Sequence, residues 1–239
     1  NTEEEMNKFQ KEHPKVNVLY AHKEWQAGEA GVGNARKHAN DLALLRSIKR
    51  RNQSGDLILI SNDADLDGIS NRYVTDVVNE FDNKKELDAI AGKWTLPEYA
   101  LKKPNFRAAQ RLWYILDRVI AHDASGKPEE RHLRSPGLVG RNAAFKASVY
   151  AAIGGYNPRA RLAEDLEIGW MINEARGWDP KRVGFLNSAE LISNPRRFLA
   201  AMVQKTPLIQ MYGGFHENRE VRQLDNKQTH CLVVDILVF

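Results

Sequence analysis

The chain has 239 residues, of which 42% are hydrophobic and 28% are charged, the balance of an ordinary globular protein. This length fits one large α/β domain or two small ones. The net charge of +4 is small and spread along the chain, so it gives no reason to expect nucleic acid as a partner, and a single cysteine excludes an internal disulfide.

In chain order, hydrophobic periodicity predicts an alternation of helices and strands. Helices are expected up to Pro14 and at residues 35–51, 69–81, 105–122, 141–156, 162–177 and 194–205; strands are expected at 15–22, 57–60, 181–187 and 231–239, with 84–104 irregular. This alternation favours an α/β fold with a mainly parallel sheet. No apolar run reaches about 18 residues, so we expect no membrane-spanning segment.

Local signals add detail to two of these helices. Asn34 is expected to cap the helix at 35–51, and Asp67 the helix that begins at Ile69. The strand at 57–60 is apolar without alternation, which is typical of a strand buried on both faces of a parallel sheet. Its carboxyl end is then the expected place for a ligand.

Three aspartates, Asp63, Asp65 and Asp67, follow that strand at every second position. An EF-hand calcium loop is rejected, because its twelfth position, which needs glutamate, is occupied by Val74. A calcium loop of the β-propeller kind would use Asn71 but belongs to repeated all-β blades, which are absent from this sequence. A simple polar turn remains an alternative. The favoured interpretation is a D-x-D site that holds a divalent cation against a diphosphate.

The segment from Gly137 to Ile172 carries a longer pattern, G-x-N-x-x-x-K, then G-G-Y, then E-D. These positions are Gly140, Asn142, Lys146, Gly154, Gly155, Tyr156, Glu164 and Asp165. Together with the strand that ends in D-x-D, they make the chain resemble family 2 glycosyltransferases of the GT-A fold. The resemblance spans roughly residues 16–177. It implies a GT-A-like domain over residues 1–215, incomplete at its N-terminus, with residues 216–239 as a C-terminal extension.

The resemblance also implies a role for each matched residue. Asp65 would be the metal ligand, and Asp63 would assist the metal or contact the nucleotide ribose. Arg36 and Arg197 would bind the donor, and Gly140, Asn142 and Gly155 would line the acceptor side. Asp165 would be the catalytic base, and Glu164 would orient Asp165 or contact the acceptor. The cofactor would be Mn²⁺ or Mg²⁺.

Two departures from the family pattern shape the expected function. The family's first strand and its D-D-x-S strand are not found in this sequence, and no Q-x-x-R-W follows the acidic pair. The second departure favours transfer of single sugars over processive synthesis. We therefore expect an inverting, non-processive hexosyltransferase that moves a sugar from a nucleoside diphosphate to a hydroxyl of a glycan, a lipid or a small molecule.

The expected setting is cell-envelope polysaccharide biosynthesis in the cytoplasm, with peripheral association at the inner face of the membrane as one option. Two other functions stay open at this point. One is a nucleotidyltransferase of related fold, and the other is a non-catalytic calcium-binding or degenerate module.

Overall fold

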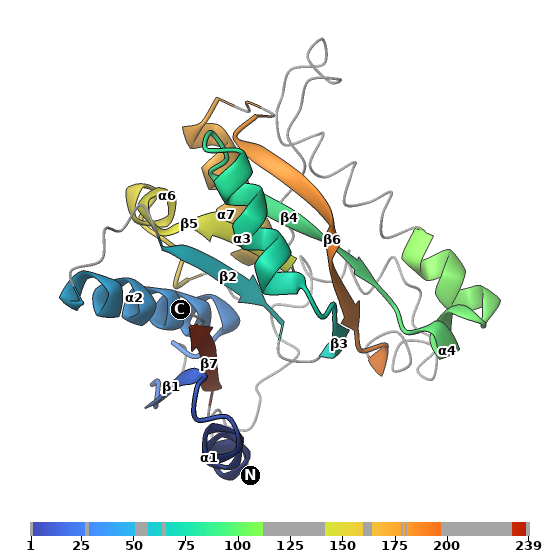
Figure 1. Cartoon of the computed structure of the whole chain (residues 1–239), viewed down its shortest axis with the longest axis horizontal. Helices are drawn as coiled ribbons and strands as arrows, with labels where there is room; N and C mark the ends of the chain where they lie inside the picture. The colour runs from blue at the N-terminus through green and yellow to red at the C-terminus, as the bar shows by residue number, and fades with distance from the viewer. Residues whose placement is uncertain are drawn as a thin grey trace.

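The structure is a computed structural model of the chain. It describes residues 2–26, 29–50, 57–63, 66–111, 142–159, 164–177, 179, 181–196 and 231–237. Within this part the protein is an α/β structure built around a curled five-stranded sheet, with a separate two-stranded sheet beside it (Figure 1).

The strand order of the larger sheet is β2-β5-β4-β6-β3. The strands are β2 (Ile58–Asn62), β3 (Leu66–Ile69), β4 (Ala89–Thr95), β5 (Asn142–Lys146) and β6 (Val183–Ser193). Only β4 and β6 pair in parallel among these described strands; β2 with β5, β5 with β4, and β3 with β6 are antiparallel. The α/β class is therefore confirmed, but the prediction of a mainly parallel sheet is wrong, because β5 and β3 run against their neighbours.

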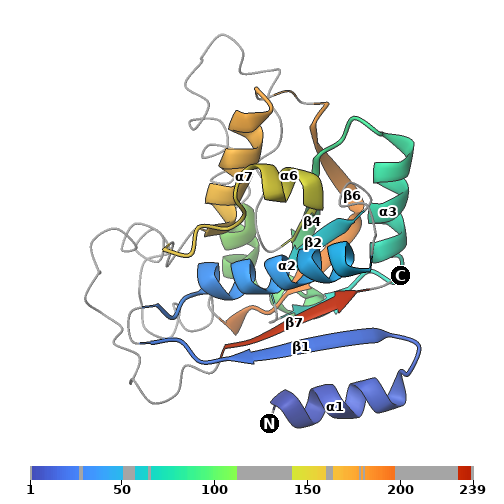
Figure 2. The same ribbon diagram turned by 90° about the vertical axis from the view of Figure 1, so that its left-hand side faces the viewer.

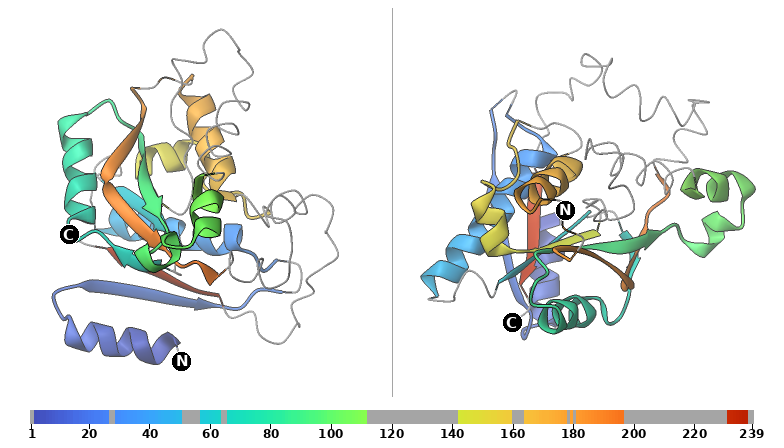
Figure 3. Two further views of the ribbon diagram at one scale, coloured as in Figure 1. Left: turned by 90° about the vertical axis from the view of Figure 1, so that its right-hand side faces the viewer. Right: turned by 90° about the horizontal axis from the view of Figure 1, so that it is seen from above.

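Helices cover both faces of this sheet (Figure 3). On one face, α3 (Tyr73–Asn83) buries Tyr73, Val77 and Phe81 against Ile90 and Leu191. On the other face lie α2 (Val32–Lys49), α6 (Ala147–Ala152) and α7 (Glu164–Ala175). Their core includes Leu59, Phe145, Tyr156, Ile168 and Ile172. The alternation of strand residues between these two cores shows which side chains share a face.

The chain begins with α1 (Thr2–Glu12) and β1 (Asn17–Lys23), both close to their predicted positions. The C-terminal apolar segment forms β7 (Cys231–Leu237), as predicted, and pairs with β1 in antiparallel register. Figure 2 shows β7 between β1 and α2, and the α2 backbone contacts β7. The expected C-terminal extension is therefore joined to the N-terminal part of the chain.

Several predicted boundaries and element types differ from those in the structure. The segment expected to be irregular contains β4, followed by the short helix α4 (Glu98–Leu101). The first half of the helix predicted at 141–156 is strand β5, and a helical turn begins only at Ala147. The strand at 57–60 is confirmed as β2, but it pairs antiparallel with β5 at one edge of the described sheet, so the parallel surroundings expected for it are wrong.

Neither predicted cap residue caps its helix. α2 already begins at Val32, so Asn34 lies in its first turn, where its amide donates to the Glu29 carbonyl. Asp67 lies inside β3, and α3 starts only at Tyr73 without a side-chain cap. Among the described residues, no helix combines the length and apolar character that a membrane crossing requires.

Candidate functional site

A buried charge cluster lies where β2 ends. Residues of β2 alternate between the two cores, so Leu59 and Ser61 face the α2 side, and Asp63 follows two positions later on the same side. There Arg36 from α2 contacts both Asp63 and Glu164, which lies in the first turn of α7. Three residues predicted to act at one site are thus brought together by Arg36.

Arg36 is the centre of this cluster. Its Nη2 lies 2.5 Å from Oδ1 of Asp63, and its Nε lies 3.2 Å from Oε1 of Glu164. Its Nη1 donates to Oγ of Ser61 at 3.1 Å. The exposed side-chain fractions are 12% for Arg36, 23% for Asp63 and 8% for Glu164, so these charges interact with little screening by water.

Tyr156 contacts both Ser61 and Arg36 in this cluster. It is completely buried, and its hydroxyl donates to Oγ of Ser61 at 2.9 Å. The Arg36 guanidinium lies 5.9 Å from the centre of the Tyr156 ring, a cation–π distance. We define the Arg36 cluster as Arg36, Ser61, Asp63, Tyr156 and Glu164.

The glycine pair before Tyr156 lets the chain turn from α6 into this position. Gly154 and Gly155 have φ values of 81° and 75°, and the Gly155 amide donates to the Tyr150 carbonyl at 2.9 Å. A Cβ on Gly155 would lie 2.6 Å from the Tyr150 ring. Gly155, predicted to line the acceptor side, therefore has a clear backbone role in placing Tyr156.

The electrostatics of the cluster shift three ionisation equilibria. Burial and the neighbouring charge of Asp165 raise the pKa of Glu164 above its ordinary value, although Arg36 opposes this. Burial also raises the pKa of Tyr156. Burial alone would lower the pKa of Arg36, but Tyr156, Asp63 and Glu164 outweigh it, so that pKa is raised. A carboxyl that holds its proton more readily is typical of acid–base sites.

Asn142 is paired with Asn62 at the end of β2, but its side chain lies on the α3 face of the sheet, opposite to the Arg36 cluster. Its Nδ2 donates to the carbonyls of Lys93 and Ala189 at 2.7 and 2.8 Å, and its Oδ1 accepts from the Tyr73 hydroxyl at 2.6 Å. It is 2% exposed. Its role on the acceptor side stays a prediction, while the structure shows it as a bridge between three strands and α3.

Asp67 belongs to a second, more exposed network. Its two carboxylate oxygens accept from the Tyr99 hydroxyl at 3.2 Å and from Nδ2 of Asn194 at 2.7 Å. Oδ1 of Asn194 accepts from the Arg196 amide at 2.9 Å, the contact expected of a helix cap. Asp67 thus ties β3 to α4 and to the residue that follows β6.

Three predicted site residues, Asp65, Gly140 and Arg197, lie outside the described residues. Sequence reasoning assigned no role to Ser61, although the period of a strand places it on the same face as Asp63. Tyr156 was matched to the family pattern without a function, and only the fold shows that it supports Arg36.

In the part of the chain that the structure describes, no three histidine, cysteine, aspartate or glutamate side chains form a group that could hold a metal ion. Asp63 nonetheless offers the hard oxygen ligand that Mg²⁺ and Mn²⁺ prefer. The carboxyl of Asp165 is close enough to Glu164 to raise its pKa, so three carboxyls, those of Asp63, Glu164 and Asp165, lie near the Arg36 guanidinium.

No protein-family model matches the chain, and a comparison with curated proteins finds no match. Fold and site together define a class of protein. It is an α/β protein with a mixed five-stranded sheet and a buried arginine–carboxylate cluster at the carboxyl end of an outer strand.

Proposed function

We propose that the chain is a metal-dependent, inverting, non-processive glycosyltransferase of the GT-A type, with a nucleoside-diphosphate sugar as donor. The observation that carries this proposal is the pair of contacts from Arg36 to Asp63 and to Glu164. These contacts bring the D-x-D strand end and the E-D helix start to one place, as a transferase site requires.

The two acidic motifs would serve opposite sides of the transferred sugar. Asp63, with Asp65, would hold Mn²⁺ or Mg²⁺, which when bound would neutralise the diphosphate leaving group. Asp165 would accept the proton of the acceptor hydroxyl, since inverting transfer needs a carboxylate on the side away from the leaving group.

Arg36 and Glu164 would position these groups. Arg36 fixes the Asp63 carboxylate on one side and Glu164 on the other, so the distance between the two motifs is set by one planar guanidinium. Glu164 directly precedes Asp165 at the start of α7, so its contact with Arg36 would hold this first turn, and with it Asp165, beside Asp63.

The test is a panel of nucleotide sugars with Mn²⁺, with release of nucleoside diphosphate as the readout. We expect Asp165→Asn to lower kcat at least about a hundredfold, the lower range for loss of an acid–base group, and Asp63→Asn to lower it to a similar extent, about a hundredfold, by weakening the hold on the metal. Asp67→Asn is the matched control, because Asp67 belongs to the same run of aspartates but lies in β3 and is bound to Tyr99 and Asn194. Its kcat should stay within about threefold of the wild type.

Other outcomes would contradict the proposal. Release of pyrophosphate in place of nucleoside diphosphate would identify a nucleotidyltransferase. A rise in Tm with Ca²⁺, together with no nucleotide release from any donor, would identify a binding module.

A further inference from the structure

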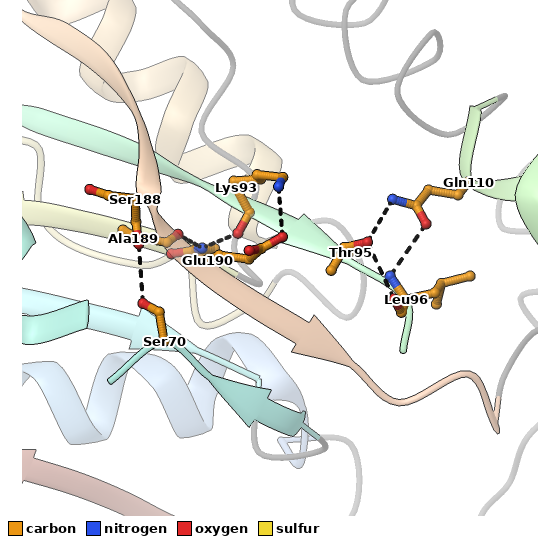
Figure 4. A network of polar contacts seen from close by, with 9 residues as sticks. Ser70, Lys93, Thr95, Leu96, Gln110, Ser188, Ala189 and Glu190 are labelled. Carbon is orange, nitrogen blue, oxygen red and sulfur yellow. Dashed lines mark hydrogen bonds and ion pairs between the residues drawn. The ribbon is translucent and has the colours of Figure 1, made fainter. Parts of the chain in front are cut away.

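We propose that Lys93 and Glu190 form a saccharide-binding pair on the acceptor side of the site, so that the acceptor is a neutral sugar with neighbouring hydroxyls. This inference rests on the proposed glycosyltransferase function and names the substrate class. It starts from an ion pair between β4 and β6, where Nζ of Lys93 lies 2.7 Å from Oε1 of Glu190 (Figure 4).

The pair lies on the same face of the sheet as the Arg36 cluster. Lys93 follows Ala91 by two positions on β4, and Ala91 belongs to the core under α2, α6 and α7. Glu190 lies between Ala189 and Leu191, which both belong to the α3 core, so its side chain points to the other face. Asp63, Lys93 and Glu190 are therefore presented on one side of the sheet.

The position across the sheet fits an acceptor rather than a donor. Lys93 is on β4, two strands from the β2 end that carries Asp63, and neighbouring strands lie about 4.8 Å apart. Across the sheet, Lys93 is thus roughly 10 Å and Glu190 on β6 roughly 14 Å from the expected metal side, a span that leaves room for a sugar between them and the metal. Both residues are also near the carboxyl ends of parallel strands, where α/β sheets bind ligands.

The backbone around the pair is held in an unusual register. β6 has extra residues opposite the Gly92–Lys93 step, so Gly92 pairs with Leu186 but Lys93 with Glu190. Asn142 satisfies the Lys93 and Ala189 carbonyls beside this bulge, and the position of its amide leaves no room for a Cβ on Gly92. The bulge is what aligns Glu190 with Lys93, and bulges commonly re-aim side chains beside active sites.

The donor and acceptor groups of Lys93 and Glu190 match the hydroxyls of a neutral sugar. The side chains are 41% and 35% exposed, and an ion pair this exposed adds little to folding stability. It does present an ammonium donor next to a carboxylate acceptor, which together match two neighbouring hydroxyls. Because the two charges cancel, the pair gives no excess attraction for a phosphate-bearing lipid.

The experiment measures transfer by the full chain to methyl glycosides of glucose, galactose, mannose and N-acetylglucosamine, with polyprenyl phosphate as the alternative acceptor. For the glycoside that the wild type uses, we expect Lys93→Met and Glu190→Gln each to raise the acceptor KM at least tenfold. The donor KM and the slow hydrolysis of donor without acceptor should not change, which separates acceptor binding from catalysis and from folding. Lys85→Met, in the exposed ion pair with Asp82, is the matched control and should change none of these values.

The inference is overturned if wild-type transfer is accelerated only by polyprenyl phosphate, or if both variants keep the wild-type acceptor KM. In either case donor hydrolysis shows that the proposed glycosyltransferase survives. If the wild type releases no nucleotide from any donor, the proposed function itself fails, and this inference fails with it. If either variant loses the cooperative thermal transition of the wild type, the swap variant Lys93→Glu/Glu190→Lys, which keeps the ion pair, is expected to fold and to show the raised KM.

Discussion

Arg36 is the residue on which the candidate site depends most. Its guanidinium contacts Asp63, Glu164 and Ser61 at once, and all of them are largely shielded from water. Buried carboxylates that lose their cationic partner are costly, because nothing replaces the lost interaction. Arg36 is therefore as important for folding as for any chemistry at this site.

This leads to a prediction for stability. Arg36→Gln should lower the free energy of unfolding by about 3 kcal/mol, since it leaves Glu164 and Asp63 without their guanidinium. Arg72→Gln is the control, because Arg72 forms an ion pair with Asp76 on α3 but its side chain is 73% exposed. The control should cost about 0.5 kcal/mol or less. Urea unfolding measures both, and equal losses would contradict a special role for the cluster.

At the scale of elements, the accuracy of the sequence predictions follows the strength of the local signal. β2 and α7 were found because one is a continuous apolar run and the other begins with two acids and ends near a glycine. β5 reads Asn-Ala-Ala-Phe-Lys, and its alanines indicate helix unless the neighbouring strands are known. β4 was missed because Gly92 and Lys93 interrupt its apolar pattern, and the bulge that explains them is a tertiary feature.

In the candidate site too, local sequence signals predicted single residues, while the contacts between them are tertiary features. Arg36, Asp63 and Glu164 were each predicted from motifs, but motifs could not show that one arginine joins them. The cap predicted for Asp67 is wrong because the chain pairs Leu66 and Gly68 with β6 before α3 starts. Strand pairing over a long sequence distance outweighed a local helix signal.

The bulge between β4 and β6 yields a second stability prediction. Asn142→Ala should cost about 2–3 kcal/mol, because the carbonyls of Lys93 and Ala189 lose a donor and the Tyr73 hydroxyl is left with Asn62 as its acceptor. Gly92→Ala should be destabilising alone, since its Cβ overlaps the Asn142 amide, but much less so when Asn142 is already alanine. The double-mutant cycle should give a coupling energy of about 1 kcal/mol or more.

The control for this cycle is Asn79→Ala on the exposed surface of α3, which should add independently to Gly92→Ala. Simple additivity between Gly92→Ala and Asn142→Ala would show that the bulge does not depend on their contact.

Considered as a whole, the molecule contains two sheets that share one helix. α2 lies against the larger sheet through Ala43 and against β7 on another side. In the described residues, β1 and β7 pair with each other and with no strand of the larger sheet. The two sheets should therefore differ in their stability to local opening.

We predict that removing residues 231–239 leaves the larger sheet folded but opens β1. Backbone amides of Asn17–Lys23 should lose most of their protection from hydrogen exchange, because their antiparallel partner is gone. Amides of Ala89–Thr95 should keep theirs, since both partners of β4 remain. Loss of protection in both strands together would show that the chain opens as a single unit.

The small residues of α2 have a consequence for the charged ones. Ala35, Ala39 and Ala43 are buried at four-residue spacing, and Ala43 packs into the core between α2 and the larger sheet, where its small side chain allows the helix to come close. Arg36 is carried on the same helix, so uncharged methyl groups determine how far its guanidinium extends toward Asp63. In a protein that diverges from this one, the size of these three side chains would tune the strength of the ion pair without any change to the charged residues.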